Sequence, residues 1–148
     1  MNPRRVLPLL PLLSLLAGCA AGHLTPSTTA LMRFGNGICR ESKSGLMWQE
    51  EAGPAVTGWN EAQAQVADLK LGGYTDWRLP TKEELLDLLL LCERNRQTNC
   101  PKRLHTGHWL GREAEEGEAG YWESYPLCDG VDYRFVEQQE GVVRAVRP

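Results

Sequence analysis

The sequence predicts an α+β domain, because two helical patterns in the middle of the chain have strand patterns on either side. The helical patterns are runs with apolar residues at helical spacing, at about 57–71 and 81–92. Apolar and polar residues alternate at 131–135, and short apolar runs flank a polar turn at 42–45. We therefore expect two helices packed on small antiparallel sheets, with the first and last strands paired.

The first 18 residues have the pattern of a bacterial export signal. Arg4 and Arg5 precede the apolar run 6–16, which is shorter than the roughly 20 residues of a membrane-spanning helix. Small residues then lead to Leu16-Ala17-Gly18-Cys19, which resembles the lipobox of bacterial lipoproteins. The alternative is a soluble secreted protein whose signal peptide merely contains a cysteine.

The lipobox resemblance implies that residues 1–18 are removed and that Cys19 carries lipid. A diacylglyceryl thioether and an acylated new N-terminus, with palmitate as the expected acyl group, supply three chains that anchor a protein permanently. Ala20 follows the cysteine, where an Asp retains lipoproteins in the inner membrane of enteric-type bacteria. We therefore expect a lipid anchor in the cell envelope, at the outer membrane.

Residues 19–32 are predicted to form a flexible tether behind the lipid, since small and hydroxylated residues cannot build a core. The folded domain is predicted at 33–148. Loss of the signal peptide leaves 14 basic against 19 acidic residues, because Arg4 and Arg5 are removed with it. An acidic domain without a basic stripe argues against nucleic acid as a partner.

Four cysteines remain after Cys19, and an even number in an exported domain predicts two disulfides. Three pairings are possible. The short polar loop between Cys92 and Cys100 favours that pair, which leaves Cys39 with Cys128. A metal site or redox thiol is the alternative, although the sequence holds no CxxC.

Short motifs place the elements along the domain. A hairpin is expected at 38–49. The first helix is predicted to begin with Thr57 as its N-cap and to end at Gly72 and Gly73.

The second helix begins with a stronger signal. Thr81 and Glu84 fit a capping box, in which each side chain bonds the other residue's backbone N–H. The run Leu85 to Leu91 carries only one charge, so we expect this helix to be buried on more than one side, under the sheet, with Cys92 fixing its end.

The last third is predicted to be β. Strands are expected at 121–125 and 131–135, and after a turn at 139–141 the chain returns over 142–147. An acidic loop, 113–120, precedes them.

The stretch LGGYTDWRLPTKEEL at 71–85 resembles the signature of the Lcl C-terminal domain family, also called DUF1566. Flanking pieces agree in order and spacing: SGLMWQ at 44–49, WNEA at 59–62, YWES at 121–124 and VRAVR at 143–147. The resemblance covers the whole folded part. It implies a fold similar to C-type lectins and an exported or surface protein. Some members are adhesins that bind host polymers.

One departure from the family pattern is Ala145, where many members carry a cysteine; Cys128 could serve instead. No catalytic residues come with the motif. We interpret the motif side chains as structural, with Trp77 filling a helix–sheet junction and Arg78 bonding carbonyls at a chain crossing. This structural set is Trp48, Trp77, Arg78, Leu79, Pro80, Thr81 and Trp122.

Metal and catalytic sites are poorly supported by the sequence. His105 and His108 lie on a glycine-containing loop without a helical frame that would aim both rings at one ion. The loop 113–120 could bind calcium, but a solvated acidic loop is the simpler reading. Formylglycine-generating oxidases share the WRLPT sequence, yet they require a late cysteine pair and Cys128 is the only late cysteine. We therefore expect no metal, no cofactor and no enzyme activity.

Two side chains are predicted to contact a ligand. Trp109 is expected to be exposed beside His108, within a loop surface at 105–130. The function expected first is a non-enzymatic envelope lipoprotein whose lectin-like domain binds a glycan, other polymer or protein. The alternative is an accessory subunit of an envelope complex, and an oxidase of the formylglycine-generating type comes last.

Overall fold

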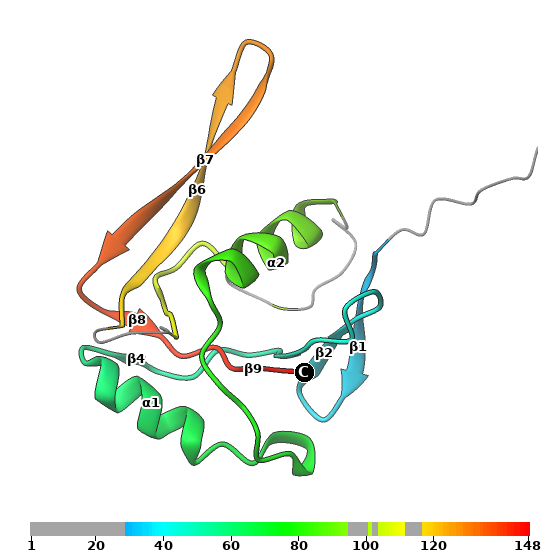
Figure 1. The fold of residues 1–148 in the computed structure, drawn as a ribbon, viewed down its shortest axis with the longest axis vertical. Coiled ribbons are helices and arrows are strands. Elements are labelled where there is room, and N and C mark those ends of the chain that lie inside the picture. The colour runs from blue at the N-terminus through cyan, green and yellow to red at the C-terminus, as the bar shows by residue number, and fades with distance from the viewer. Residues whose placement is uncertain (1–28, 95–100, 102–103, 112–116) are drawn as a thin grey trace, which may run out of the picture.

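The computed structural model describes residues 29–94, 101, 104–111 and 117–148 (Figure 1). The predicted signal peptide, Cys19, most of the tether and Cys100 lie outside these residues. The described elements are β1 (Leu31–Gly35), β2 (Ile38–Glu41), β3 (Met47–Gln49), β4 (Ala55–Val56), α1 (Trp59–Ala67), a 3₁₀ turn η1 (Leu71–Gly73), α2 (Lys82–Arg94), β5 (His108–Trp109), β6 (Ala119–Leu127), β7 (Gly130–Gln138), β8 (Gly141–Val142) and β9 (Val146–Arg147).

The α+β prediction is confirmed, with two helices and two small sheets. The first sheet has the order β1-β2-β3-β9, and every neighbouring pair is antiparallel. The predicted hairpin is β2–β3, in which Cys39 lies opposite Trp48. The last strand joins the sheet of the first strands, as expected, but it pairs with β3 and not with β1, since Trp48 lies opposite Val146 of β9.

The second sheet has the order β4-β8-β5-β6-β7 and contains one parallel pair, β5–β8. The strand expected over 142–147 is interrupted, so that β8 joins this sheet and β9 joins the first. Between them the chain bends to bury the side chain of Arg144, which is fully inaccessible. The backbone there bonds other segments instead, with Val143 accepting from Gly53 N at 2.7 Å and Ala145 accepting from Gln49 N at 2.9 Å.

Helix α1 begins one residue later than predicted. Its N-cap is Gly58, which has no side chain to bond the helix, so the predicted capping role of Thr57 is wrong. The helix ends at Ala67, before the two glycines, which instead form η1 with positive φ angles of 63° at Gly72 and 82° at Gly73. The positive φ angle at Gly72 favours glycine there, and a Cβ would also meet the end of the Ile38 side chain from β2.

Helix α2 begins with the predicted capping box. Thr81 N donates to Glu84 Oε2 at 2.9 Å, and Glu84 N donates to Thr81 Oγ1 at 3.2 Å. The helix buries Leu85, Leu88, Leu89 and Leu91. It packs on β1–β3 on one side and contacts β6 on the other, which confirms that it is buried on more than one side (Figure 1).

Strands β6 and β7 form a long hairpin that extends past α2 (Figure 1). Where the hairpin passes α2, Trp122 and Tyr133 are half-buried against the core, and Tyr133 Oη donates to Glu93 of α2 at 2.6 Å. At its tip, which extends past the other described elements, Leu127 and Val131 are each 54% exposed (Figure 1). Of the predicted buried face at 131–135, Tyr133 and Phe135 are therefore half-buried, whereas Val131 is exposed.

The predicted cysteine pairings are wrong. Cys92 and Cys128 are both thiols, so neither the pair Cys92–Cys100 nor the pair Cys39–Cys128 forms. The hairpin turn carries Cys128 to the exposed tip, whereas Cys39 is buried on β2 beneath α2. Cys39 is itself disulfide-bonded.

Within the described ranges, no helix combines the length and the apolar character that crossing a membrane requires.

Candidate functional site

The five tryptophans form two groups, according to whether the indole N–H has a hydrogen-bond acceptor. Four of them donate it to a backbone carbonyl that lies far along the chain or in the signature turn: Trp59 to Leu110 at 3.2 Å, Trp77 to Leu71 at 3.2 Å, Trp109 to Val56 at 3.0 Å and Trp122 to Lys82 at 3.0 Å. These four side chains join separate segments, as expected for a folding role. The fifth, Trp48, is the exception described below.

The prediction that Trp109 and His108 form an exposed ligand surface is wrong. Trp109 is 6% exposed and His108 is fully inaccessible, because β5 pairs on both sides with β6 and β8 in the middle of the second sheet. The sequence interpretation placed both residues in a loop, since a two-residue strand carries no alternation pattern. Both side chains belong to the interior, so neither contacts a ligand from solvent.

His108 is instead bonded to Arg144 inside the protein. Arg144 Nε donates to His108 Nε2 at 3.2 Å, and the Arg144 guanidinium also donates to the carbonyls of Gln49 at 2.7 Å and Glu50 at 2.9 Å. On its other side, His108 Nδ1 lies 2.6 Å from the carbonyl of Thr106. An imidazole that accepts at Nε2 and donates at Nδ1 is neutral.

Burial and the Arg144 charge both favour this neutral form, and lower the pKa of His108 to about 3. Burial likewise lowers the pKa of Arg144 to about 10. The pair links the chain before β4, strand β5 and the segment between β8 and β9. We assign it a structural role, because it is sealed from solvent.

The signature residues also have structural contacts. Arg78 donates two hydrogen bonds to the Glu84 carboxylate, at 2.6 and 2.7 Å, and one to the Leu79 carbonyl at 3.2 Å. Burial alone would raise the pKa of Glu84, but the bonds from Arg78 and Thr81 hold it below its ordinary value. The expected role of Arg78 thus takes a different form, since a carboxylate is its main acceptor.

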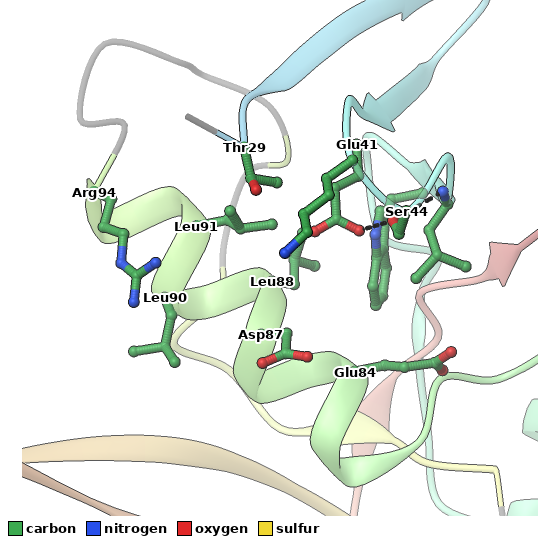
Figure 2. A pocket seen from close by; sticks show the side chains of 12 residues that line it. Thr29, Glu41, Ser44, Glu84, Asp87, Leu88, Leu90, Leu91 and Arg94 are labelled. Carbon is green, nitrogen blue, oxygen red and sulfur yellow. Dashed lines mark hydrogen bonds between the residues drawn. The ribbon is translucent and has the colours of Figure 1, made fainter. Parts of the chain in front are cut away.

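A pocket of about 440 Å³ lies between α2 and the inner face of the first sheet (Figure 2). We call it the α2 pocket. Leucines and Trp48 form its apolar part, and charged or hydroxyl side chains from both elements surround its opening. Its lining is Thr29, Glu41, Lys43, Ser44, Leu46, Trp48, Glu84, Asp87, Leu88, Leu90, Leu91 and Arg94.

Trp48 gives the α2 pocket its distinctive feature. The side chain is 1% exposed, yet among the described residues its Nε1–H has no hydrogen-bond partner. It is the only buried side-chain nitrogen or oxygen in that state within the described part of the chain. A buried donor without an acceptor costs about 1–3 kcal/mol, so this N–H is unusual and marks a place where an acceptor could bind.

Glu41 lies on the same sheet face as Trp48. Cys39 pairs with Trp48 across β2 and β3, and Glu41 follows Cys39 by two residues, so all three side chains point to one side. Glu41 is 9% exposed and accepts a hydrogen bond from Ser44 Oγ, also in the pocket lining (Figure 2). The lining of the α2 pocket therefore includes an indole donor, Trp48, and a carboxylate acceptor, Glu41.

The sequence interpretation missed the α2 pocket although it named Trp48. The signal it could have used is the strand alternation at 38–41, which places the acidic Glu41 on the inward face with Cys39. A carboxylate on an inward face is uncommon and calls for an explanation. The contribution of Asp87 from α2 depends on the packing of helix against sheet, which no local pattern predicts.

A second, more open pocket of about 630 Å³ lies beside the signature motif. Trp77, Arg78 and Leu79 line it together with Val66 of α1. Here the indole N–H and the guanidinium are already bonded within the protein. Within the described part of the chain, this pocket has no buried polar side-chain atom without a partner, so we place the candidate site in the α2 pocket.

The described residues contain no group of three or more His, Cys, Asp or Glu side chains that could hold a metal ion. His105 is described and exposed, whereas Glu113 to Glu116 of the predicted acidic loop lie outside the described residues. The question of calcium at that loop thus falls largely outside the structure.

The described residues form a small α+β domain with a long hairpin, a capped helix and a pocket of mixed polar and apolar lining, and tryptophans that bond distant carbonyls join its segments. Residues 37–147 match the family described as the Lcl C-terminal domain, and the chain belongs to that family. The search of curated proteins and the search of solved structures each found no match.

Proposed function

We propose that this protein is a lipid-anchored lipoprotein of the bacterial envelope whose Lcl C-terminal domain binds a ligand and performs no catalysis. The observation that carries the binding function is the α2 pocket, with its buried and unpartnered Trp48 N–H. The two helices and two small sheets support a C-type-lectin-like arrangement as the framework.

The anchor rests on the sequence before the domain. The short apolar run and the lipobox-like Leu16 to Cys19 support lipid on Cys19, and Ala20 supports the outer membrane. The described domain begins close to this point, at Thr29, so the tether between lipid and fold is short. The domain would therefore work near a membrane surface.

A second candidate is an accessory subunit of an envelope complex. It is favoured by the hairpin tip, where Leu127 and Val131 are each exposed and Pro126 lies opposite Val131. Exposed apolar residues grouped at one place often mark contacts with another protein. Co-purification of a stable partner after mild solubilisation, lost in Leu127→Ser with Val131→Ser, would favour this candidate.

The proposed function is tested by cell fractionation together with a glycan array. We expect the native protein in the membrane fraction and Cys19→Ser in the soluble fraction, because the lipid is the only strong anchor proposed. We expect the membrane-extracted protein to bind a defined set of glycans on the array. A Cys19→Ser variant that stays with the membrane contradicts the anchor, and an array without binding contradicts glycan recognition.

A further inference from the structure

The α2 pocket has a hydrogen-bonding pattern that restricts its ligand. Two of its lining residues supply a buried donor without a partner, Trp48 Nε1–H, and an acceptor, the Glu41 carboxylate, and both residues lie on the same face of the first sheet. A carboxylate ligand could accept from the indole but would repel Glu41. An ammonium could donate to Glu41 but would leave the indole N–H without an acceptor. A hydroxyl group does both, because one oxygen accepts and donates.

The charges around the opening indicate a neutral ligand. Glu84 is already paired with Arg78. The other charged lining residues are two carboxylates, Glu41 and Asp87, and two cations, Lys43 and Arg94. This balance gives the space no net attraction for an anion or a cation.

The remaining lining is suited to the carbon skeleton of a polyol. Leu46, Leu88 and Leu91 offer apolar surface next to the polar groups, and the volume of about 440 Å³ falls in the range of small-molecule sites. Sugar rings combine hydroxyl groups with apolar C–H faces. We propose that the α2 pocket binds a neutral sugar residue, with one hydroxyl accepting from Trp48 Nε1–H and donating to Glu41.

This proposal rests on the proposed binding function and specifies its ligand and its contact residues. It differs from the surface expected at Trp109 and His108, which the fold buries. A bound water is the simplest competitor, because water also accepts and donates. The test must therefore distinguish a sugar from a peptide amide and from water.

The test follows the five indole N–H signals of ¹⁵N-labelled, membrane-extracted protein in a detergent without a sugar headgroup. Trp48→Phe identifies the Trp48 signal by its loss. The probes are glucose, galactose, mannose and N-acetylglucosamine, with triglycine as the amide probe. We expect at least one sugar to move the Trp48 signal saturably at millimolar concentration, while the four carbonyl-bonded indoles stay in place and triglycine has no effect.

One variant locates the binding. Glu41→Gln keeps the size and shape of the side chain, and we expect it to weaken sugar binding about tenfold, since a charge-assisted hydrogen bond becomes a neutral one. Glu137→Gln, an exposed residue on β7 outside the pocket, is the matched control and should leave the affinity unchanged.

Three results overturn the proposal. The first is that no sugar changes the chemical shift of the Trp48 indole N–H, and the second is that triglycine changes it as much as a sugar does. The third is that the indole N–H exchanges with water at the same rate with and without sugar. Its failure is separable from that of the proposed function. Glycan-array binding that survives Glu41→Gln leaves the proposed function standing and rejects the α2 pocket as its site. If a sugar shifts the Trp48 signal but the protein binds no glycan on the array, the α2 pocket is supported as a sugar site and glycan-polymer binding is contradicted.

Discussion

At the scale of single residues, position in the fold decides what each tryptophan does. Trp109 and Trp122 each reach across the chain to bond a carbonyl, at Val56 and Lys82. Trp48, which lines the α2 pocket, is at least as buried, yet its N–H has no acceptor among the described residues. The same residue type thus holds the fold together in four places and marks a candidate site in the fifth.

His108 makes stability depend on pH. Its pKa in the folded protein is about 3, below the ordinary 6.5 of the unfolded chain, because burial and Arg144 disfavour the charged ring. Below pH 6.5 the unfolded chain therefore binds a proton that the folded protein does not. Stability is complete above that pH and falls as the pH drops, by up to about 1.4 kcal/mol per pH unit.

Urea unfolding between pH 7 and pH 4 measures this dependence. His108→Gln is the control, because an amide can still accept from Arg144 and donate to Thr106 but does not titrate. We expect the variant to lose the part of the slope due to His108. A His108 ring that titrates near 6.5 by NMR in the folded protein contradicts the buried assignment.

Residue roles that rest on local chemistry could be predicted from the sequence, and those that rest on distant contacts could not. The capping partners Thr81 and Glu84 are three residues apart, so their pattern is visible in the chain. Trp109 and Arg144 are bonded to residues 53 and 94–95 positions away, respectively. Their burial follows from sheet topology, which a local pattern does not encode.

At the scale of elements, α2 organises the candidate site. Its N-terminus is fixed by the capping box and by Arg78, and its inward face forms one wall of the α2 pocket. The helix was predictable because its apolar run and its start signal agree. Its C-terminal end was predicted wrongly, since Cys92 is a thiol whose pKa burial raises to about 11.

Loss of the cap should weaken α2 and the whole domain together. Thr81→Ala removes the hydroxyl that accepts from Glu84 N, and we expect a loss of about 1 kcal/mol in the free energy of unfolding. Glu83→Ala, at an exposed position of the same first turn, is the control and should change stability by less than about 0.5 kcal/mol. Equal losses in thermal unfolding of the two variants would contradict the role of the cap.

At the scale of the whole molecule, the chemical states of the cysteines bear on both the folded domain and the proposed lipid anchor. Five cysteines occur in the chain; Cys92 and Cys128 are thiols and Cys39 is disulfide-bonded. If Cys19 carries lipid, Cys100 is the cysteine that remains for Cys39. The sequence correctly indicated an α+β domain whose last strand returns to the sheet of the first strands. Cysteine spacing gave the wrong disulfide pairs, because spacing along the chain does not show where each residue lies in the fold.

Mass spectrometry of the native protein, extracted from membranes and alkylated under denaturing, non-reducing conditions, tests the central claim most directly. We predict a mature chain that begins at a lipid-modified Cys19, with alkylated Cys92 and Cys128 and with Cys39 in a disulfide to Cys100. An intact N-terminus that retains residues 1–18, together with an unmodified Cys19 thiol, would contradict the account of an anchored envelope lipoprotein.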